Sequence, residues 1–180
     1  MRRREDPVSV DGASIYPNFG ILSFGRGTFE KPPIDGSSTS AKTLNRVHAG
    51  QFIYSRLFAF EGAYSFVPES FDGWFVSNEF PTFDVNPEEL DARWLAAYLR
   101  SPDRWAELAT RSRGLGLRRQ RIPSDAVLAY EIWLPPYDEQ QKFLALGDRI
   151  VTMQAGYRHL MQITDALPQS ALNHVLASLR

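Results

Sequence analysis

The chain has 180 residues, of which 43% are hydrophobic, and its 20 Lys and Arg side chains nearly balance its 21 Asp and Glu side chains. It has no cysteine, which excludes a disulfide framework and a thiolate metal site, and its three histidines are too scattered to suggest a metal centre. No apolar run is long enough to span a bilayer, and the basic start leads into Glu5-Asp6-Pro7 rather than into a signal-peptide core. We therefore expect a soluble cytoplasmic protein with no metal and no cofactor.

The net charge of −1 conceals an uneven distribution along the chain. Residues 1–58 carry +3, residues 59–110 carry −7 and residues 111–180 carry +3. Five arginines fall within eleven residues that contain no carboxylate: Arg111, Arg113, Arg118, Arg119 and Arg121. Because a phosphate-binding surface needs an excess of Lys and Arg, this Arg-rich segment is a candidate nucleic-acid contact. The alternative is a solvated basic loop.

Short apolar and aromatic runs alternate with turn-forming residues over 15–82, a pattern typical of β-strands between turns. The expected strands are Phe19–Gly25, Gln51–Phe58, Tyr64–Val67, Gly73–Val76 and Thr82–Val85. The stretch 29–44 contains Pro32-Pro33, Gly36 and a Ser/Thr tract, which predicts a flexible or ligand-ordered loop. Most aromatic side chains of these strands are expected to pack in a core rather than to stack on bases.

The hydrophobic period changes at Asn86-Pro87, where an Asn cap, a proline and the acids Glu88-Glu89 predict the start of a helix. A second short helix is expected to begin at Ser101-Pro102. After the Arg-rich segment, the sequence predicts a strand over Ala129–Leu134.

The section from Asp138 onward has the most regular pattern, because its apolar residues are spaced alternately three and four apart, with Thr164 as a polar exception. These positions are Phe143, Leu146, Ile150, Met153, Tyr157, Leu160 and Leu167. A strict pattern of this kind predicts a coiled-coil helix over 138–167, about 45 Å long, with a narrow apolar seam. Pro168 is expected to end it, and a short terminal helix to follow. Since the chain offers no second helix of matching length, we expect the partner helix to come from another polypeptide.

Two fragments imitate a DNA methyltransferase. The run Phe24-Gly25-Arg26-Gly27 is similar to a turn that holds the methyl donor, but it lies among turn-rich strands instead of a βαβ unit. The run beginning at Leu134 is similar to a motif that holds a flipped base, but a leucine cannot accept a hydrogen bond from the exocyclic amine. His48 has no neighbouring acid or nucleophile in the sequence. The sequence therefore predicts no catalytic residue.

Four motifs in a fixed order are shared with one protein family. A predicted strand ending in Leu134-Pro135-Pro136 runs into a helix opening with Glu139-Gln140. Upstream stand Gly50-Gln51-Phe52-Ile53-Tyr54-Ser55, Val76-Ser77-Asn78-Glu79-Phe80 and Tyr98-Leu99-Arg100-Ser101. By these motifs the chain resembles type I restriction-modification DNA specificity subunits over nearly its whole length, from Ile15 to Leu179.

The resemblance implies an α+β fold: a mixed α/β target recognition domain over residues 1–137, then a long coiled-coil helix and a short C-terminal helix over 138–180. It implies sequence-specific binding of double-stranded DNA without catalysis, and a modification (methyltransferase) subunit as partner, with a restriction subunit in addition where the system restricts. Full-length members resemble two such units in tandem, whereas this sequence supplies one. We therefore expect a homodimer through the seam residues, which would favour a palindromic split target.

The expected DNA-binding residues are basic side chains on turn-rich loops, at one strand end and in the Arg-rich segment. They are Arg26, Lys31, Lys42, Arg56, Arg111, Arg113, Arg118, Arg119 and Arg121. Arginine suits this task because its fork pairs bidentately with guanine or with phosphate oxygens. The acidic middle of the chain would either point away from the duplex or meet a basic surface of the modification subunit. The alternative function is a coiled-coil adaptor or oligomerisation protein without DNA affinity.

Overall fold

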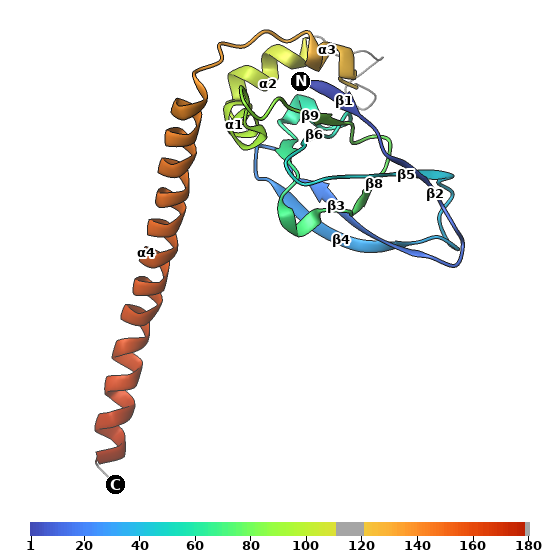
Figure 1. Ribbon diagram of the computed structural model, residues 1–180. Helices are drawn as coiled ribbons and strands as arrows, with labels where there is room; N and C mark the ends of the chain where they lie inside the picture. The colour runs from blue at the N-terminus through green and yellow to red at the C-terminus, as the bar shows by residue number, and fades with distance from the viewer. Residues whose placement is uncertain (111–120, 179–180) are drawn as a thin grey trace. The chain divides into compact units, whose positions relative to one another are not determined.

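A computed structural model gives the structure of residues 1–110 and 121–178, without the side chains of 167–170, 172 and 175. The chain divides into two units, Met1–Gln140 and Gln141–Arg180, which are described separately below. The N-terminal unit contains strands and short helices, and the C-terminal unit is helical (Figure 1). Within the described ranges, no helix combines the length and apolar content needed to cross a membrane.

The strands of the N-terminal unit form two sheets (Figure 1). The four-stranded sheet has the order β1 (Arg2–Arg4), β9 (Thr82–Asp84), β6 (Phe52–Tyr54) and β7 (Tyr64–Phe66). The five-stranded sheet has the order β2 (Pro7–Ser9), β5 (Thr43–Arg46), β8 (Phe75–Val76), β3 (Ile15–Ile21) and β4 (Thr28–Asp35). Neighbouring strands are antiparallel except β3 and β8, which are parallel.

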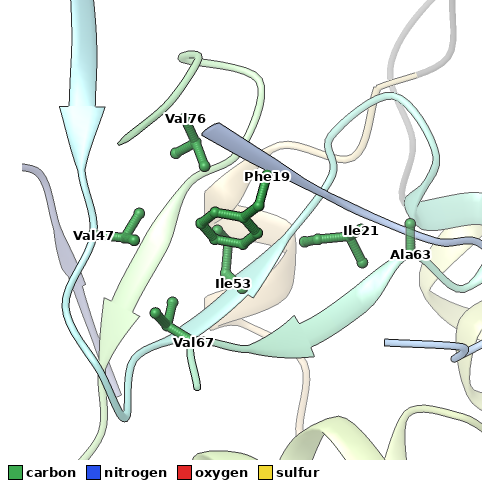
Figure 2. Packing of buried hydrophobic residues seen from close by; sticks show 7 residues of the cluster. All are labelled: Phe19, Ile21, Val47, Ile53, Ala63, Val67 and Val76. Carbon is green, nitrogen blue, oxygen red and sulfur yellow. The ribbon is translucent and has the colours of Figure 1, made fainter. Parts of the chain in front are cut away.

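Buried side chains from both sheets meet in a hydrophobic cluster. Figure 2 shows the ring of Phe19 in the middle of this cluster, and Phe71 stacks on the same ring with a centroid distance of 4.6 Å. The cluster consists of Phe19, Ile21, Val47, Ile53, Ala63, Val67 and Val76. Fully burying a large apolar side chain contributes about 1.5–3 kcal/mol, so this cluster holds the two sheets together.

The aromatic residues of the strands largely take the core role that their pattern predicts. Phe52 and Tyr54 on β6 are fully buried, and they pack against Tyr64 and Phe83 with ring centroids 5.7–6.4 Å apart. Phe58, by contrast, is exposed. The buried rings are therefore unavailable for stacking on bases.

Two buried tyrosines, on β6 and β7, differ in the hydrogen bonding of their hydroxyl groups. The Tyr54 hydroxyl donates a hydrogen bond to the carbonyl of Ile122 at 2.9 Å, and burial raises the pKa of Tyr54 to about 12. Burial also raises the pKa of Tyr64, whose hydroxyl has no hydrogen-bond partner in the part of the chain that the structure describes.

Tyr54→Phe is therefore expected to lower the free energy of unfolding by about 1 kcal/mol, because it leaves a buried carbonyl unsatisfied. Tyr64→Phe is expected to raise it by about 1 kcal/mol, because it removes an unsatisfied buried hydroxyl. Urea unfolding of both variants measures the difference. Equal midpoints for the two variants would contradict the hydrogen-bond assignment.

Short helices complete the N-terminal unit: η1 (Ala59–Glu61), η2 (Glu69–Phe71), α1 (Ala92–Tyr98), α2 (Pro102–Ala109) and α3 (Ser124–Leu128). The prediction of α2 is confirmed, with Ser101 as its N-cap residue. The helix expected from Asn86 begins only at Ala92, where the Asp91 side chain accepts a hydrogen bond from the Arg93 amide at 2.7 Å. Residues 86–90 form a turn instead, closed by the Leu90 amide on the Asn86 carbonyl at 2.9 Å.

The prediction of a loop over 29–44 is confirmed only for residues 36–42 and was wrong at both ends. The residues Pro32-Pro33 lie inside β4, and β5 begins at Thr43. A proline lacks an N–H but is tolerated in an edge strand, and β4 is the edge of its sheet. The register shifts opposite the two prolines, and the Asn18 side-chain amide donates to the Pro32 carbonyl at 2.9 Å.

The prediction of a strand over Ala129–Leu134 was also wrong, because this segment has no regular secondary structure. Some of its apolar side chains pack without ladder pairing, whereas Trp133 is exposed. Ile132 and Leu134 line a cavity of about 200 Å³ together with Leu95, Leu99 and Leu108 from the region of α1 and α2. The β-strand propensity of the segment was thus overridden by tertiary packing.

The long helix expected from Asp138 is confirmed as α4 (Tyr137–Ser178). Its 42 residues correspond to about 63 Å at 1.5 Å per residue. The prediction that Pro168 ends it was wrong, because the helix continues through that position into the expected terminal helix. A proline removes one backbone hydrogen bond at a cost of about 3 kcal/mol, and helical turns on both sides offset that loss.

Candidate nucleic-acid interface

The expected DNA-binding residues lie on different segments of the N-terminal unit. Arg26 lies on the loop between β3 and β4, Lys31 on β4, Lys42 just before β5, Arg56 after β6 and Arg121 before α3. The other four lie outside the described residues: Arg111, Arg113, Arg118 and Arg119.

Ion pairing distinguishes four of the described candidates from other arginines of the N-terminal unit. In residues 1–110 and 121–178, four of the candidates have no carboxylate within ion-pairing distance: Arg26, Lys31, Lys42 and Arg56. The arginines of β1 are paired instead, Arg2 and Arg4 with Asp84 and Arg3 with Glu5. Unpaired cations can bind phosphate without first breaking an ion pair, so these four residues are the candidates best suited to a phosphate contact.

Arg121 and Arg56 come together around Glu79. The guanidinium of Arg121 forms a forked ion pair with the Glu79 carboxylate, with both hydrogen bonds at 3.2 Å. The Arg56 amide donates to the Glu79 carbonyl at 2.9 Å, and the Arg56 carbonyl accepts from the Ile122 amide at 3.1 Å. The Arg56 Nε is buried and has no hydrogen-bond partner among the described residues. These contacts hold Arg121 close to the end of β6.

The loop between β3 and β4, residues 22–27, exposes an aromatic ring and a guanidinium together. Phe24 has 61% of its surface exposed, although its backbone φ is +64°. The left-handed conformation costs a non-glycine residue roughly 1–2 kcal/mol, and it is unusual for a bulky side chain. Arg26 lies over the same ring, with its guanidinium carbon 5.8 Å from the ring centroid, and its Nε donates to the Ser23 carbonyl at 3.0 Å.

The rest of the N-terminal unit holds this loop in place. The Phe24 amide donates to the Glu61 carbonyl at 2.7 Å and the Gly25 amide to the Gly62 carbonyl at 3.0 Å. A Cβ atom at Gly25 would lie 2.4 Å from the Cγ of Arg100, which leaves room only for glycine. Arg100 thus lies beside the loop. Sequence reasoning missed it, because nothing in an arginine between two short helices indicates which distant loop it lies beside.

His48 has acidic neighbours that the sequence does not reveal. Its Nε2 lies 3.0 Å from Asp6 and its Nδ1 lies 4.0 Å from Asp72, both distant in the chain. An open cavity of about 440 Å³ next to it is also lined by Arg4 and Asp84, which pair with each other at 3.5 Å. In the described part of the chain, no group of three or more His, Asp or Glu side chains is placed to hold a metal ion.

The two methyltransferase-like fragments have structural roles. The turn at Phe24–Gly27 connects the antiparallel strands β3 and β4, in keeping with the expectation that it is not part of a βαβ unit. In the second fragment, the Pro135 carbonyl accepts a hydrogen bond from the buried side chain of Gln140 at 2.9 Å. The first fragment therefore forms a turn between two strands, and the second provides a hydrogen-bond acceptor for Gln140.

The predicted seam of α4 is exposed. The six seam residues whose side chains the structure describes have between 47% and 72% of their surface accessible: Phe143, Leu146, Ile150, Met153, Tyr157 and Leu160. The side chain of Leu167 lies outside the described residues. An apolar stripe of this length on an isolated helix is typical of a surface that packs against another helix.

No protein-family model and no curated protein matches the sequence. Solved structures do match its fold. The crystal structure of the HsdS subunit from Thermoanaerobacter tengcongensis aligns with a TM-score of 0.68 and 20% identity, over 87% of this chain and 41% of that one. A structure reported for the complex assembly and conformational transition of the type I R-M system aligns with a TM-score of 0.54 and 19% identity, over 95% of this chain and 49% of that one.

The chain thus spans less than half the length of either matching structure. The alignments cover most of this chain, and they agree with the resemblance predicted from the four sequence motifs. This chain has the α+β fold of a type I restriction-modification HsdS subunit.

Proposed function

We propose that this chain is a DNA specificity component of a type I restriction-modification system. It binds a particular sequence in double-stranded DNA and positions a methyltransferase subunit there, together with a restriction subunit where the system restricts. The observation that carries the proposal is the fold likeness to an HsdS subunit over 87% of the chain. Methyl transfer belongs to the partner subunit, because Leu134 stands where a base-holding motif needs a hydrogen-bond acceptor.

The distribution of charge supports DNA as the ligand. The four unpaired candidates Arg26, Lys31, Lys42 and Arg56 offer phosphate contacts. The Arg-rich segment adds arginines within a stretch that contains no carboxylate. Glu61 and Glu79 lie beside candidate residues, at Ser23 and Arg121. The other acidic residues of 59–110 are assigned to a surface away from the duplex, where they are suited to a basic partner surface.

Two copies of the chain are proposed to pair through the seam of α4. The chain spans less than half of the matching structures, and six apolar seam residues are exposed. A two-fold arrangement of identical recognition domains would read a palindromic target with two separated half-sites. This assembly supplies the partner helix that the long, narrow seam requires.

The test of the proposed function is selection from a pool of random-sequence DNA duplexes with the full-length chain. Enrichment of one split motif, together with copurification of a methyltransferase subunit from the native source, is the expected result. A chain that dimerises but binds no duplex even at low salt would instead be the coiled-coil adaptor. A chain that binds every duplex equally would also contradict the specificity role.

Neutralising Arg118 and Arg119 together, as Arg118→Gln and Arg119→Gln, is expected to weaken binding and to flatten its salt dependence. Each phosphate contact contributes about 0.9 to the slope of log affinity against log salt, so the slope should fall by about 1–2. Titration of a labelled duplex at several salt concentrations measures it. The matched control is Arg149→Gln on α4. An unchanged slope would remove both arginines from the phosphate contacts.

A further inference from the structure

The loop between β3 and β4 combines three features that core packing does not require. Its tip carries an exposed aromatic ring, that ring belongs to a residue in the left-handed backbone region, and an exposed arginine lies against it. Single exposed apolar side chains are common and need no explanation. A bulky residue held in a strained conformation at an exposed tip is different, because such strain persists only where the surroundings enforce it and it gathers at functional sites.

The surroundings of Phe24 enforce its conformation through the backbone. Its amide and that of Gly25 both donate to carbonyls at Glu61 and Gly62, and the Ser23 hydroxyl donates to the Glu61 carboxylate at 2.9 Å. The Leu22 amide closes the loop on the Gly27 carbonyl at 2.9 Å. The ring of Phe24 meets Trp105 edge-on, with centroids 5.4 Å apart. The tip is therefore preorganised, and its ring is presented without a further loss of conformational freedom.

The chemistry of the tip fits a DNA groove bordered by phosphates. An apolar ring packs against base edges such as the thymine methyl group, and it can wedge against a deformable base step. A guanidinium with no carboxylate partner binds a phosphate. Within the described ranges, the one hydrogen bond of the Arg26 guanidinium runs from Nε to the Ser23 carbonyl, which leaves its terminal nitrogens for such a contact.

We propose that the tip formed by residues 23–27 reads the target duplex, with Phe24 against a base pair in the groove and Arg26 on the adjacent phosphate. This inference rests on the proposed function, since it names the part of the DNA-binding surface that discriminates between sequences. The two side chains have separable tasks. Phe24 contributes to the preference for the target, and Arg26 contributes affinity for any duplex.

The experiment uses the full-length chain, the duplex selected from a random-sequence pool by the wild type, and the unselected pool as competitor. Phe24→Ala is expected to lower the preference for the selected duplex by about 10-fold while leaving the salt slope unchanged. Arg26→Gln is expected to lower the slope by about 0.9 and to weaken binding to both duplexes equally. The matched control is Trp133→Ala, which removes an aromatic side chain that is even more exposed, at 76% against 61%, elsewhere in the N-terminal unit.

Phe24→Asn guards against loss of the fold. Asparagine tolerates left-handed backbone better than other non-glycine residues, so this variant should keep the unfolding midpoint of the wild type while losing the same preference as Phe24→Ala. If either folded Phe24 variant selects the duplex as well as the wild type does, the tip does not read the sequence and the inference is overturned, while the proposed function stands. A wild type that enriches no sequence overturns both.

Discussion

Replacing Gln140 with alanine is expected to lower the free energy of unfolding of the chain by about 3–5 kcal/mol, a large part of the stability of an ordinary domain. The side chain is fully buried and makes three hydrogen bonds. Its Oε1 accepts from the Asp91 amide at 3.0 Å, and its Nε2 donates to the carbonyls of Glu89 at 2.7 Å and Pro135 at 2.9 Å. Alanine would remove all three of these hydrogen bonds to backbone groups, and each loss costs about 1–3 kcal/mol.

Chemical denaturation measured by circular dichroism checks this result. Gln154→Ala, at an exposed position of α4, is the matched control and should shift the free energy of unfolding by no more than about 0.5 kcal/mol. Gln140→Glu keeps the size and the acceptor but presents a carboxylate to two carbonyls, so it should destabilise the chain as well. A Gln140→Glu variant as stable as the wild type would mean that the Nε2 bonds contribute nothing.

The same glutamine explains why one helix starts later than its sequence predicts. The carbonyl of Glu89 and the amide of Asp91 would both belong to a helix that began at Asn86, but Gln140 binds them in a turn. The cap at Asp91 then takes over as the start of α1. The sequence contains two possible helix N-caps, Asn86 and Asp91. Hydrogen bonds from Gln140, which is far along the chain, favour the second. Local pattern alone cannot supply that information.

Elements whose stability depends on local pattern were predicted well. The alternating three-and-four spacing predicted α4, Ser101-Pro102 predicted α2, and the short runs around Phe52 and Tyr64 predicted the strands β6 and β7. Elements that depend on their place in the sheet were missed. β4 can contain two prolines because it is an edge strand. The sequence did not predict the order of the strands in either sheet.

For the candidate interface, the sequence predicted residue types but not their pairing. Arg121 and Arg26 looked alike, yet Arg121 forms a forked pair with Glu79 and Arg26 has no carboxylate partner in the described residues. The role of Phe24 was also hidden, because its left-handed backbone follows from hydrogen bonds to Glu61 and Gly62 that only the fold creates. The sequence shows which side chains are charged. Whether a charged side chain is already ion-paired depends on the tertiary structure.

Placing a carboxylate in the seam of α4 is the second change with a large expected effect. Ile150→Glu should weaken the proposed association of two chains by at least about 100-fold, because each copy would bury an ionised group at a cost of several kcal/mol and every 1.4 kcal/mol is a factor of about ten. Val151→Glu is the matched control. It introduces the same side chain at the next residue, about 100° around the helix and off the seam, at a position already 62% exposed.

Sedimentation at micromolar concentration distinguishes the two variants: the wild type and Val151→Glu should be dimers, and Ile150→Glu a monomer. A monomeric wild type would overturn the pairing, and a monomeric Val151→Glu would move the interface off the predicted seam.

DNA binding by the same variants connects assembly with function. Because each copy contributes its own phosphate contacts, monomeric Ile150→Glu should bind duplex with about half the salt slope of the dimer and should select one half-site in place of two. An unchanged slope would mean that a single copy already makes every phosphate contact.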